Sequence, residues 1–386
     1  MLAAPVRPGL AAEGGGTLEG RAHAYRDDAR LYVSSLEGAW THPLPRSLTL
    51  SLRAVADWIT ILPPPAGEAA DPHAGHGPGH EHIEEYDNPM APDAISGASA
   101  RASAGSSGSR ELRAGGGLGL AWRGRRGNIP VTLAAEARGS GEPDYRSASG
   151  TVSGGLALFQ GNTSVSGFAG LGWDETDPAH PPPGQSGAWP ASQSKVSAGL
   201  GVSQDLTRRL TVSAGASAAI QSGRLSSPYR NSLVGITYFP EQLPEERVRA
   251  TAFAMASLYL GRGAALHLRE GFYADDWGVR AWIPEAALAK EWGRWLATLR
   301  HRFYAQSRAE FYRPVYDDRT GYQTGDARLG RLYDQTGALS LEYRLGPRAR
   351  PLFLSAGYSF SHLEYPDLHP RTLISHVFGC GVRAEY

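Results

Sequence analysis

Hydrophobic and polar residues alternate strictly over many segments of the chain. In residues 195–203, Val196, Ala198, Leu200 and Val202 share one face, and Lys, Ser or Gly occupies each position between them. A period of two is typical of a β-strand whose faces meet different environments. Residues 210–220 repeat the pattern after a short polar break, which predicts two strands joined by a tight turn.

The same alternation recurs from about residue 18 to the end of the chain and predicts about 16 strands, with 14 as the lower bound. The two weakest segments are residues 18–27 and 279–290. In the second, Pro284 interrupts the hydrogen-bonding pattern, which favours an edge-like or bulged position. An even number of strands returns both termini to the same side.

The breaks between these segments distinguish a soluble β-sandwich from a membrane barrel. Short breaks at 43–46, 124–128, 160–163, 205–208, 261–263, 291–294 and 346–350 alternate with long ones at 63–109, 174–194, 223–246, 313–326 and 365–370. Bacterial outer-membrane barrels have short turns at one end and long loops at the other. The sequence therefore predicts an all-β fold, a transmembrane antiparallel up-and-down β-barrel with short periplasmic turns and long extracellular loops.

Aromatic residues near the strand ends support the barrel. Interfacial girdles favour amphipathic rings, and we expect them to contain Trp40, Trp58, Trp122, Trp173, Trp277, Trp292 and Trp295. The final segment places Phe378, Cys380, Val382, Ala384 and Tyr386 on one face. It resembles the terminal strand of outer-membrane barrels, in which such a pattern ending on an aromatic residue is recognised by the barrel-assembly machinery. We thus expect Phe378, Val382 and Tyr386 to form an assembly signal, and Cys380 to be an inert apolar residue facing lipid.

The predicted organisation is one barrel domain over residues 18–386, with a His-rich, Gly/Ser/Pro-rich extracellular loop at 63–109. We expect residues 1–17 to be a disordered N-terminal segment, for example the remnant of an export signal. Residues 1–13 lack the continuous apolar stretch of a secretory signal. We expect either that the precursor starts upstream or that the signal was removed and a Met remained.

Composition narrows the classes of function. The 38 basic and 38 acidic residues balance, so no net charge attracts nucleic acid. The mean hydropathy of −0.33 and the absence of a long apolar run exclude a helical membrane protein, and the single cysteine excludes a disulfide framework. A barrel gives only half of each strand to lipid, which reconciles the modest hydropathy with a membrane location.

Five short phrases occur in order along the chain: residues 93–99, Asp144–Ser147, Pro228–Arg230, Asp275–Trp277, and Tyr304–Gln306 with Phe311 and Tyr312. Together they resemble the bacterial outer-membrane β-barrel family catalogued as a domain of unknown function, number 3570. The resemblance implies a location and a shape but no reaction. It also gives a hint of metal or electron-transfer physiology, because such genes can accompany extracytosolic redox and flavin-attachment genes.

The first long loop contains a cluster of imidazole and carboxylate groups, which suits zinc, copper or nickel. The cluster comprises Asp71, His73, His76, His80, Glu81, His82, Glu84 and Glu85, and we predict His73, His76, His80 and His82 as ligands. The spacing is not that of a rigid motif. A solvated low-complexity segment that binds metal opportunistically is the alternative.

Charged residues on the polar faces of the strands are predicted to line a lumen. The candidates are Arg53, Asp57, Arg269, Arg300, Arg302, Glu342, Arg344, Arg383 and Glu385. They would either select solutes or pair across strands and fill a narrow lumen. A further acidic group at the outer rim, Asp275, Asp276, Asp317 and Asp318, is a weaker candidate for a divalent cation than for solvated loop carboxylates.

No nucleotide-binding, metalloprotease or serine-hydrolase motif is present, so we predict no enzyme. The function that the pattern favours is a pore or transport channel for small solutes or ions in the outer membrane of a Gram-negative bacterium. The alternative is a non-transporting outer-membrane component that binds a transition metal or a redox partner through its loops. The expected partners are the lipid bilayer, the assembly machinery, and small solutes or metal ions.

Overall fold

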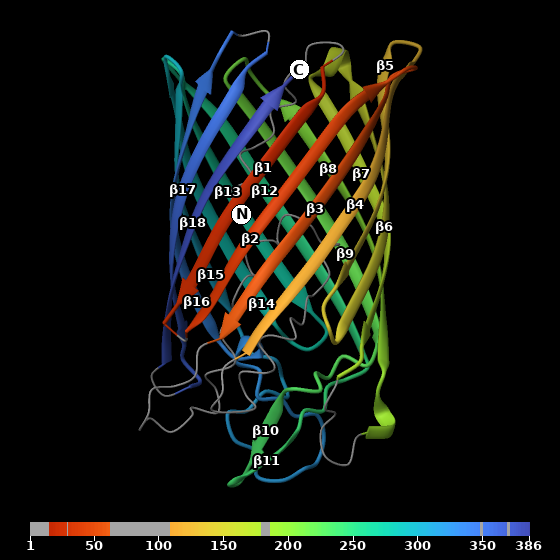
Figure 1. Cartoon of the computed structure of the whole chain (residues 1–386), viewed down its shortest axis with the longest axis vertical. Coiled ribbons are helices and arrows are strands. Elements are labelled where there is room, and N and C mark those ends of the chain that lie inside the picture. Colours follow the sequence, from red (N-terminus) through yellow and green to blue (C-terminus); the bar gives the residue numbers. More distant parts are fainter. Residues whose placement is uncertain (1–14, 29, 62–108, 179–185, 348–349, 369–370) are drawn as a thin grey trace.

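A computed structural model of the chain describes residues 15–28, 30–61, 109–178, 186–347, 350–368 and 371–386. Within these residues, sixteen antiparallel strands close into one barrel, and β10 (Asn231–Val234) and β11 (Thr237–Pro240) form a separate hairpin (Figure 1). The barrel strands are β1 (Thr17–Asp27), β2 (Leu31–Leu44), β3 (Leu48–Ile61), β4 (Ser109–Arg126), β5 (Ile129–Gly141), β6 (Tyr145–Leu158), β7 (Thr163–Thr176), β8 (Ala191–Asp205), β9 (Leu210–Gly223), β12 (Glu246–Gly261), β13 (Ala264–Asp275), β14 (Arg280–Trp292), β15 (Trp295–Gln306), β16 (Leu332–Leu345), β17 (Leu352–Tyr365) and β18 (Arg371–Glu385).

The barrel closes where its first strand pairs with its last. The register runs from Thr17↔Glu385 to Asp27↔Ser375 without a shift. Beyond the strand ends, Gly16 N–H donates to Tyr386 O over 2.8 Å, and Tyr386 N–H donates to Gly16 O over 3.0 Å. The predicted first strand is therefore a full member of the barrel.

The outer surface of the barrel is apolar. On β8, Leu200 is 73% exposed, whereas Lys195 and Ser197 on the other face are 4% and 2% exposed. Large hydrophobic side chains are exposed in the same alternating way on strands all around the barrel. Lipid is the environment that makes such a surface favourable, so the strands span a membrane. The described residues include no helix with the length and apolar character that crossing a bilayer requires.

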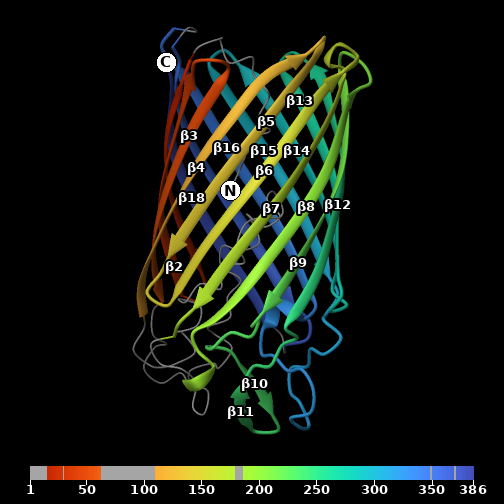
Figure 2. The same cartoon turned by 90° about the vertical axis from the view of Figure 1, so that its right-hand side faces the viewer.

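The long connections all lie at one end of the barrel, as the break lengths predict (Figures 1 and 2). The connections after β1, β5 and β13 lie at the same end and are short. Connections such as 127–128 and 293–294 lie at the opposite end, where the C-terminus also lies. The β10–β11 hairpin lies beyond the end with the long connections in both views. The fold predicted from periodicity is confirmed, including the even strand number. The hairpin inside the predicted loop at 223–246 was not foreseen.

One local prediction holds in part, and another is wrong. Pro284 lies within β14, which is an interior strand of a closed sheet and not an edge. The proline does mark an irregularity, because the β14–β15 pairing passes from Glu285↔Arg302 to Trp282↔Ala305 and leaves out the two positions between them. Trp277 is 6% exposed and packs among buried loop residues, so it is not part of an interfacial girdle.

The last strand has the predicted faces. Phe378, Val382 and Tyr386 are exposed on the outer surface, as is Cys380. Tyr386 also contacts the first hairpin, because Trp40 Nε1–H donates to its hydroxyl over 2.7 Å. Whether these residues act as an assembly signal stays a prediction.

We predict that a cation on the outer surface destabilises the barrel in proportion to its depth. Leu200→Arg, in the middle portion of β8, is expected to cost about 2–4 kcal/mol of unfolding free energy, and Leu206→Arg, in the short turn, about 0–1 kcal/mol. Urea unfolding in lipid vesicles measures both. Equal costs would contradict a membrane-spanning β8.

Candidate functional site: the lumen wall and the loop platform

The inner faces of the barrel strands form the lumen wall. The predicted lumen residues Arg53, Asp57, Arg269, Arg300, Arg302, Glu342, Arg344, Arg383 and Glu385 all alternate with outward apolar neighbours and thus face inward. Leu52 and Leu299, for example, are exposed on the outside next to Arg53 and Arg300. The orientation predicted for these charges follows directly from the strand period.

Many charges of the lumen wall are paired between neighbouring strands. Arg300 Nε lies 3.4 Å from Glu285, and Arg302 lies 3.1 Å from Asp334. Arg383 on β18 also lies 3.4 Å from Glu342 on β16, although β17 separates these two strands. Pairing keeps the wall neutral and fixes long side chains against it. By contrast, Arg53 and Arg344 form no ion pair with the described residues.

Aromatic rings on the lumen wall lie against glycines. A Cβ atom added at Gly215 would come within 2.6 Å of Phe253 Cε1, so the ring occupies the space that a side chain would need. Arg269 in turn lies 5.0 Å from the Phe253 ring centroid, within range of a cation–π contact. Phe168 covers Gly199 in the same way. Gly199 and Gly215 thus mark positions where an aromatic ring packs closely against the wall.

The structure also contains a loop platform, which we define as residues 224–245 and 307–331. Two segments far apart in sequence are joined there by backbone hydrogen bonds. The backbone N–H of Gln242 donates to Gln323 O and that of Gln323 donates to Gln242 O, each over 2.8 Å. Val234 and Tyr316 form a parallel β-bridge. The platform includes the β10–β11 hairpin, which lies beyond the barrel end (Figure 2). A loop assembly of this kind is a folded element rather than a set of independent connections.

Buried charged groups hold the loop platform together. Asp326 lies 2.9 Å from both Arg230 and Arg328, and all three are largely buried. Glu241 is 3% exposed and accepts hydrogen bonds from Ser227 N–H over 2.7 Å and from the Thr324 hydroxyl over 2.5 Å. Asp326 is ion-paired and Glu241 is hydrogen-bonded, which is the condition under which burial of such groups is tolerated.

The barrel rim connects the platform to the lumen wall. Arg247 donates to Asp275 over 2.6 Å and lies 4.4 Å from the Trp277 ring centroid. Asp275 also accepts from Trp277 N–H and Val279 N–H, which holds the β13–β14 connection. Glu310 N–H donates to Trp277 O over 2.8 Å, so the rim and the platform share one hydrogen-bonded network.

Four of the five phrases that carry the family resemblance come together in this region. Asp144 and Tyr229 are hydrogen-bonded across 85 residues, and Arg230, Trp277 and Tyr312 belong to the platform or its rim. The fifth phrase, residues 93–99, lies outside the described residues. Sequence reasoning missed the platform residues Glu241, Thr324, Asp326 and Arg328. The signal that the sequence offered for these residues was their position near the phrases that carry the family resemblance.

The predicted metal sites are not assembled in the described part of the chain. The histidine cluster, with His73, His76, His80 and His82, lies outside it. The predicted acidic residues each have a different partner. Asp275 pairs with Arg247, Asp276 accepts a hydrogen bond from Val248 N–H, and Asp318 accepts one from Thr320 N–H. No group of three or more His, Cys, Asp or Glu able to hold a metal occurs among the described residues.

We predict that the loop platform is more stable in mild acid than above neutral pH. Burial raises the pKa of Glu241 to about 7, so the folded platform favours its protonated form. This contribution is fully present below the ordinary glutamate pKa and is lost as the pH rises through about 7. Hydrogen exchange of the β10–β11 amides, corrected for intrinsic rates, should reveal faster opening at pH 8 than at pH 5. Glu241→Gln should remove the difference; a dependence that persists in this variant would contradict the assignment.

No curated protein matches the chain. Among solved structures, it is similar to a mutant of the ferric enterobactin receptor PfeA from Pseudomonas aeruginosa (13% identity, TM-score 0.44, covering 90% of this chain and 53% of that one). It is also similar to a bacterial polysaccharide outer membrane secretin (11% identity, TM-score 0.44, covering 95% and 97%) and to the outer membrane protein OpdK from Pseudomonas aeruginosa (9% identity, TM-score 0.41, covering 97% and 99%).

The chain thus spans about half the length of the enterobactin receptor, and similarity at this level does not extend to what those proteins bind. A family model gives the more specific result. It is described as "Protein of unknown function (DUF3570)" and matches residues 22–359, most of the barrel. The chain belongs to this family.

Proposed function

We propose that this protein is an outer-membrane β-barrel of a Gram-negative bacterium that gives small solutes or ions a path through its lumen. The observation that carries the proposal is the combination of an apolar exterior with a charged inner wall in a sixteen-strand barrel. Barrels of 16 to 18 strands enclose space for an aqueous channel. In the proposed orientation, the end of the barrel that carries the short turns faces the periplasm, and the end that carries the loop platform faces the outside of the cell.

The pairing of charges on the lumen wall bears on which solutes would pass. Arg300, Arg302 and Arg383 are each neutralised by a carboxylate on another strand. Arg53 and Arg344 lie on the same wall without an ion pair to the described residues, so they are available to a passing anion. We therefore expect the proposed path to favour anions only weakly, because most of the wall charges are neutralised.

The loop platform supports a second candidate function, in which the barrel binds a partner or a transition metal at its outer end without transport. Buried ion pairs and the reciprocal Gln242–Gln323 hydrogen bonds make the platform a defined surface. A rigid surface is better suited to a partner, such as a redox protein, than a loop that must be ordered on binding. The histidines at positions 73, 76, 80 and 82 would supply the metal ligands.

Conductance measurements test the first candidate. In planar bilayers the wild-type barrel should conduct, and Arg53→Glu with Arg344→Glu should shift the reversal potential toward cations, because two positive charges that form no ion pair with the described residues become negative. Arg208→Glu, in the short β8–β9 turn, should leave the reversal potential unchanged. A folded barrel that does not conduct would exclude a pore.

Calorimetry with zinc or copper tests the metal-binding part of the second candidate. Replacement of His73, His76, His80 and His82 by Ala should weaken binding at least tenfold, because neutral imidazole is the main ligand type that the loop offers. His267→Ala, on the lumen wall, is the control and should bind like wild type. Unchanged micromolar affinity in the fourfold variant would show that the loop is not the site.

A further inference from the structure

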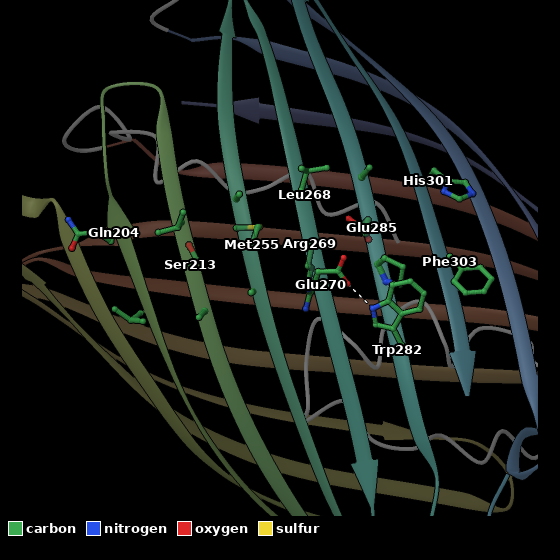
Figure 3. Close-up of a pocket in the computed structure, with 17 residues that line it drawn as sticks. Gln204, Ser213, Met255, Leu268, Arg269, Glu270, Trp282, Glu285, His301 and Phe303 are labelled. Carbon is green, nitrogen blue, oxygen red and sulfur yellow. Dashed lines mark hydrogen bonds between the residues drawn. The ribbon is translucent and has the colours of Figure 1, made fainter. Parts of the chain in front are cut away.

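A groove of about 880 Å³ runs across the outer surface of the barrel from β8 and β9 over β12 to β15 (Figure 3). Its lining includes small residues such as Ala254 and Ala256 on β12 and Ala286 on β14, which also contributes Pro284. Large exposed side chains, among them Leu268 and Trp282, stand beside them. Small residues in a membrane-facing surface allow a second protein surface to approach closely.

Of the ionisable residues that line this groove, Glu270 and His301 point their side chains outward. Glu270 lies between Leu268 and Phe272 on the outward face of β13, and His301 follows the exposed Leu299 on β15. Glu270 accepts a hydrogen bond from Trp282 Nε1–H over 2.8 Å, the contact drawn in Figure 3. His301 makes no hydrogen bond or ion pair with the described residues. Both side chains thus face the membrane.

The strand register places both groups at the same depth in the bilayer. Glu270 is six residues from the start of β13, and His301 is six residues from the start of β15; both strands have 12 residues and run in the same direction. Each therefore lies near the middle of its strand. Hydrocarbon at this depth offers no hydrogen-bond partner, and an ionisable group exposed to it is costly. A lipid headgroup lies too far away to compensate.

The two groups stand on opposite sides of β14. Glu270 is paired with Pro284 on one side, and His301 is paired with Ala286 on the other. If a second copy of the barrel faces the first across a two-fold axis along the membrane normal, the β13 side of one copy meets the β15 side of the other. Glu270 of each copy then faces His301 of its partner, with the small residues of β14 at the axis. Such a contact is self-complementary, as two-fold symmetry requires.

We propose that the part of this groove over β12 to β15 is the interface of a two-fold dimer in the membrane, in which Glu270 of each copy binds His301 of the other. The pair supplies the acceptor and donor that the bilayer lacks. It also leaves the lumen of each barrel independent, so the dimer does not depend on the transport function proposed above.

Cross-linking tests where the copies meet. In a Cys380→Ser background, Ala286→Cys lies close to the proposed axis and should form a disulfide-linked dimer in vesicles under oxidising conditions. Ala135→Cys, an equally outward position on β5 at the far side of the barrel, should give less than a tenth of that product. Equal cross-linking at the two positions, or none at Ala286→Cys, would overturn the interface.

A charge exchange tests the specific pair. Glu270→His and His301→Glu should each lower the dimer association constant in vesicles at least tenfold, by placing like groups opposite each other, and the double variant should restore it to within about threefold of wild type. Single-molecule photobleaching at several protein-to-lipid ratios measures the dimer, and heat-modifiable gel mobility confirms that each variant is folded. Folded wild-type protein that stays monomeric at every ratio would overturn the proposal. So would a monomer whose groove takes up a spin-labelled fatty acid, since the groove would then serve a lipid ligand.

Discussion

The hydrogen-bonded contact between β1 and β18 is the constraint on which the rest of this structure depends. In a bilayer every backbone N–H and C=O must find a partner within the protein, and an open sheet edge would leave a row of them unsatisfied. Closure removes the edge only if the strands keep a consistent register all around the barrel. A slip of one residue would turn apolar faces inward and charged faces toward lipid. The membrane therefore enforces the alternation from Thr17 to Glu385.

That enforcement explains why the barrel could be predicted from the sequence. Leu200 and Lys195 are separated by an odd number of positions on one strand, so their side chains point to opposite faces. This alternation alone places Leu200 in lipid and Lys195 in the lumen. Parity does not tell which charges pair. Arg302 meets Asp334 and Arg300 meets Glu285 because of the registers of β14, β15 and β16, and these depend on turn lengths that periodicity leaves open.

The loop platform was not predictable on the same basis, because its residues follow no period. Glu241 and Thr324 are hydrogen-bonded across 83 positions, and neither stands in a pattern that indicates burial. Trp277 illustrates the ambiguity: a tryptophan beside a strand end fits an interfacial girdle and a packed rim equally well. Only the fold of the connecting segments, with Arg247 stacked on its ring, distinguishes the two. Non-periodic regions acquire their structure from long-range contacts, and a single sequence does not encode them locally.

The glycine beneath Phe253 has a consequence for the calibre of the barrel. A ring packed flat against the wall takes up little of the cross-section, and it can do so only because Gly215 carries no side chain. An alanine there would displace the ring toward the barrel axis. Glycines of the inner wall therefore help to set the free width of the lumen, because they let larger side chains lie close to the wall.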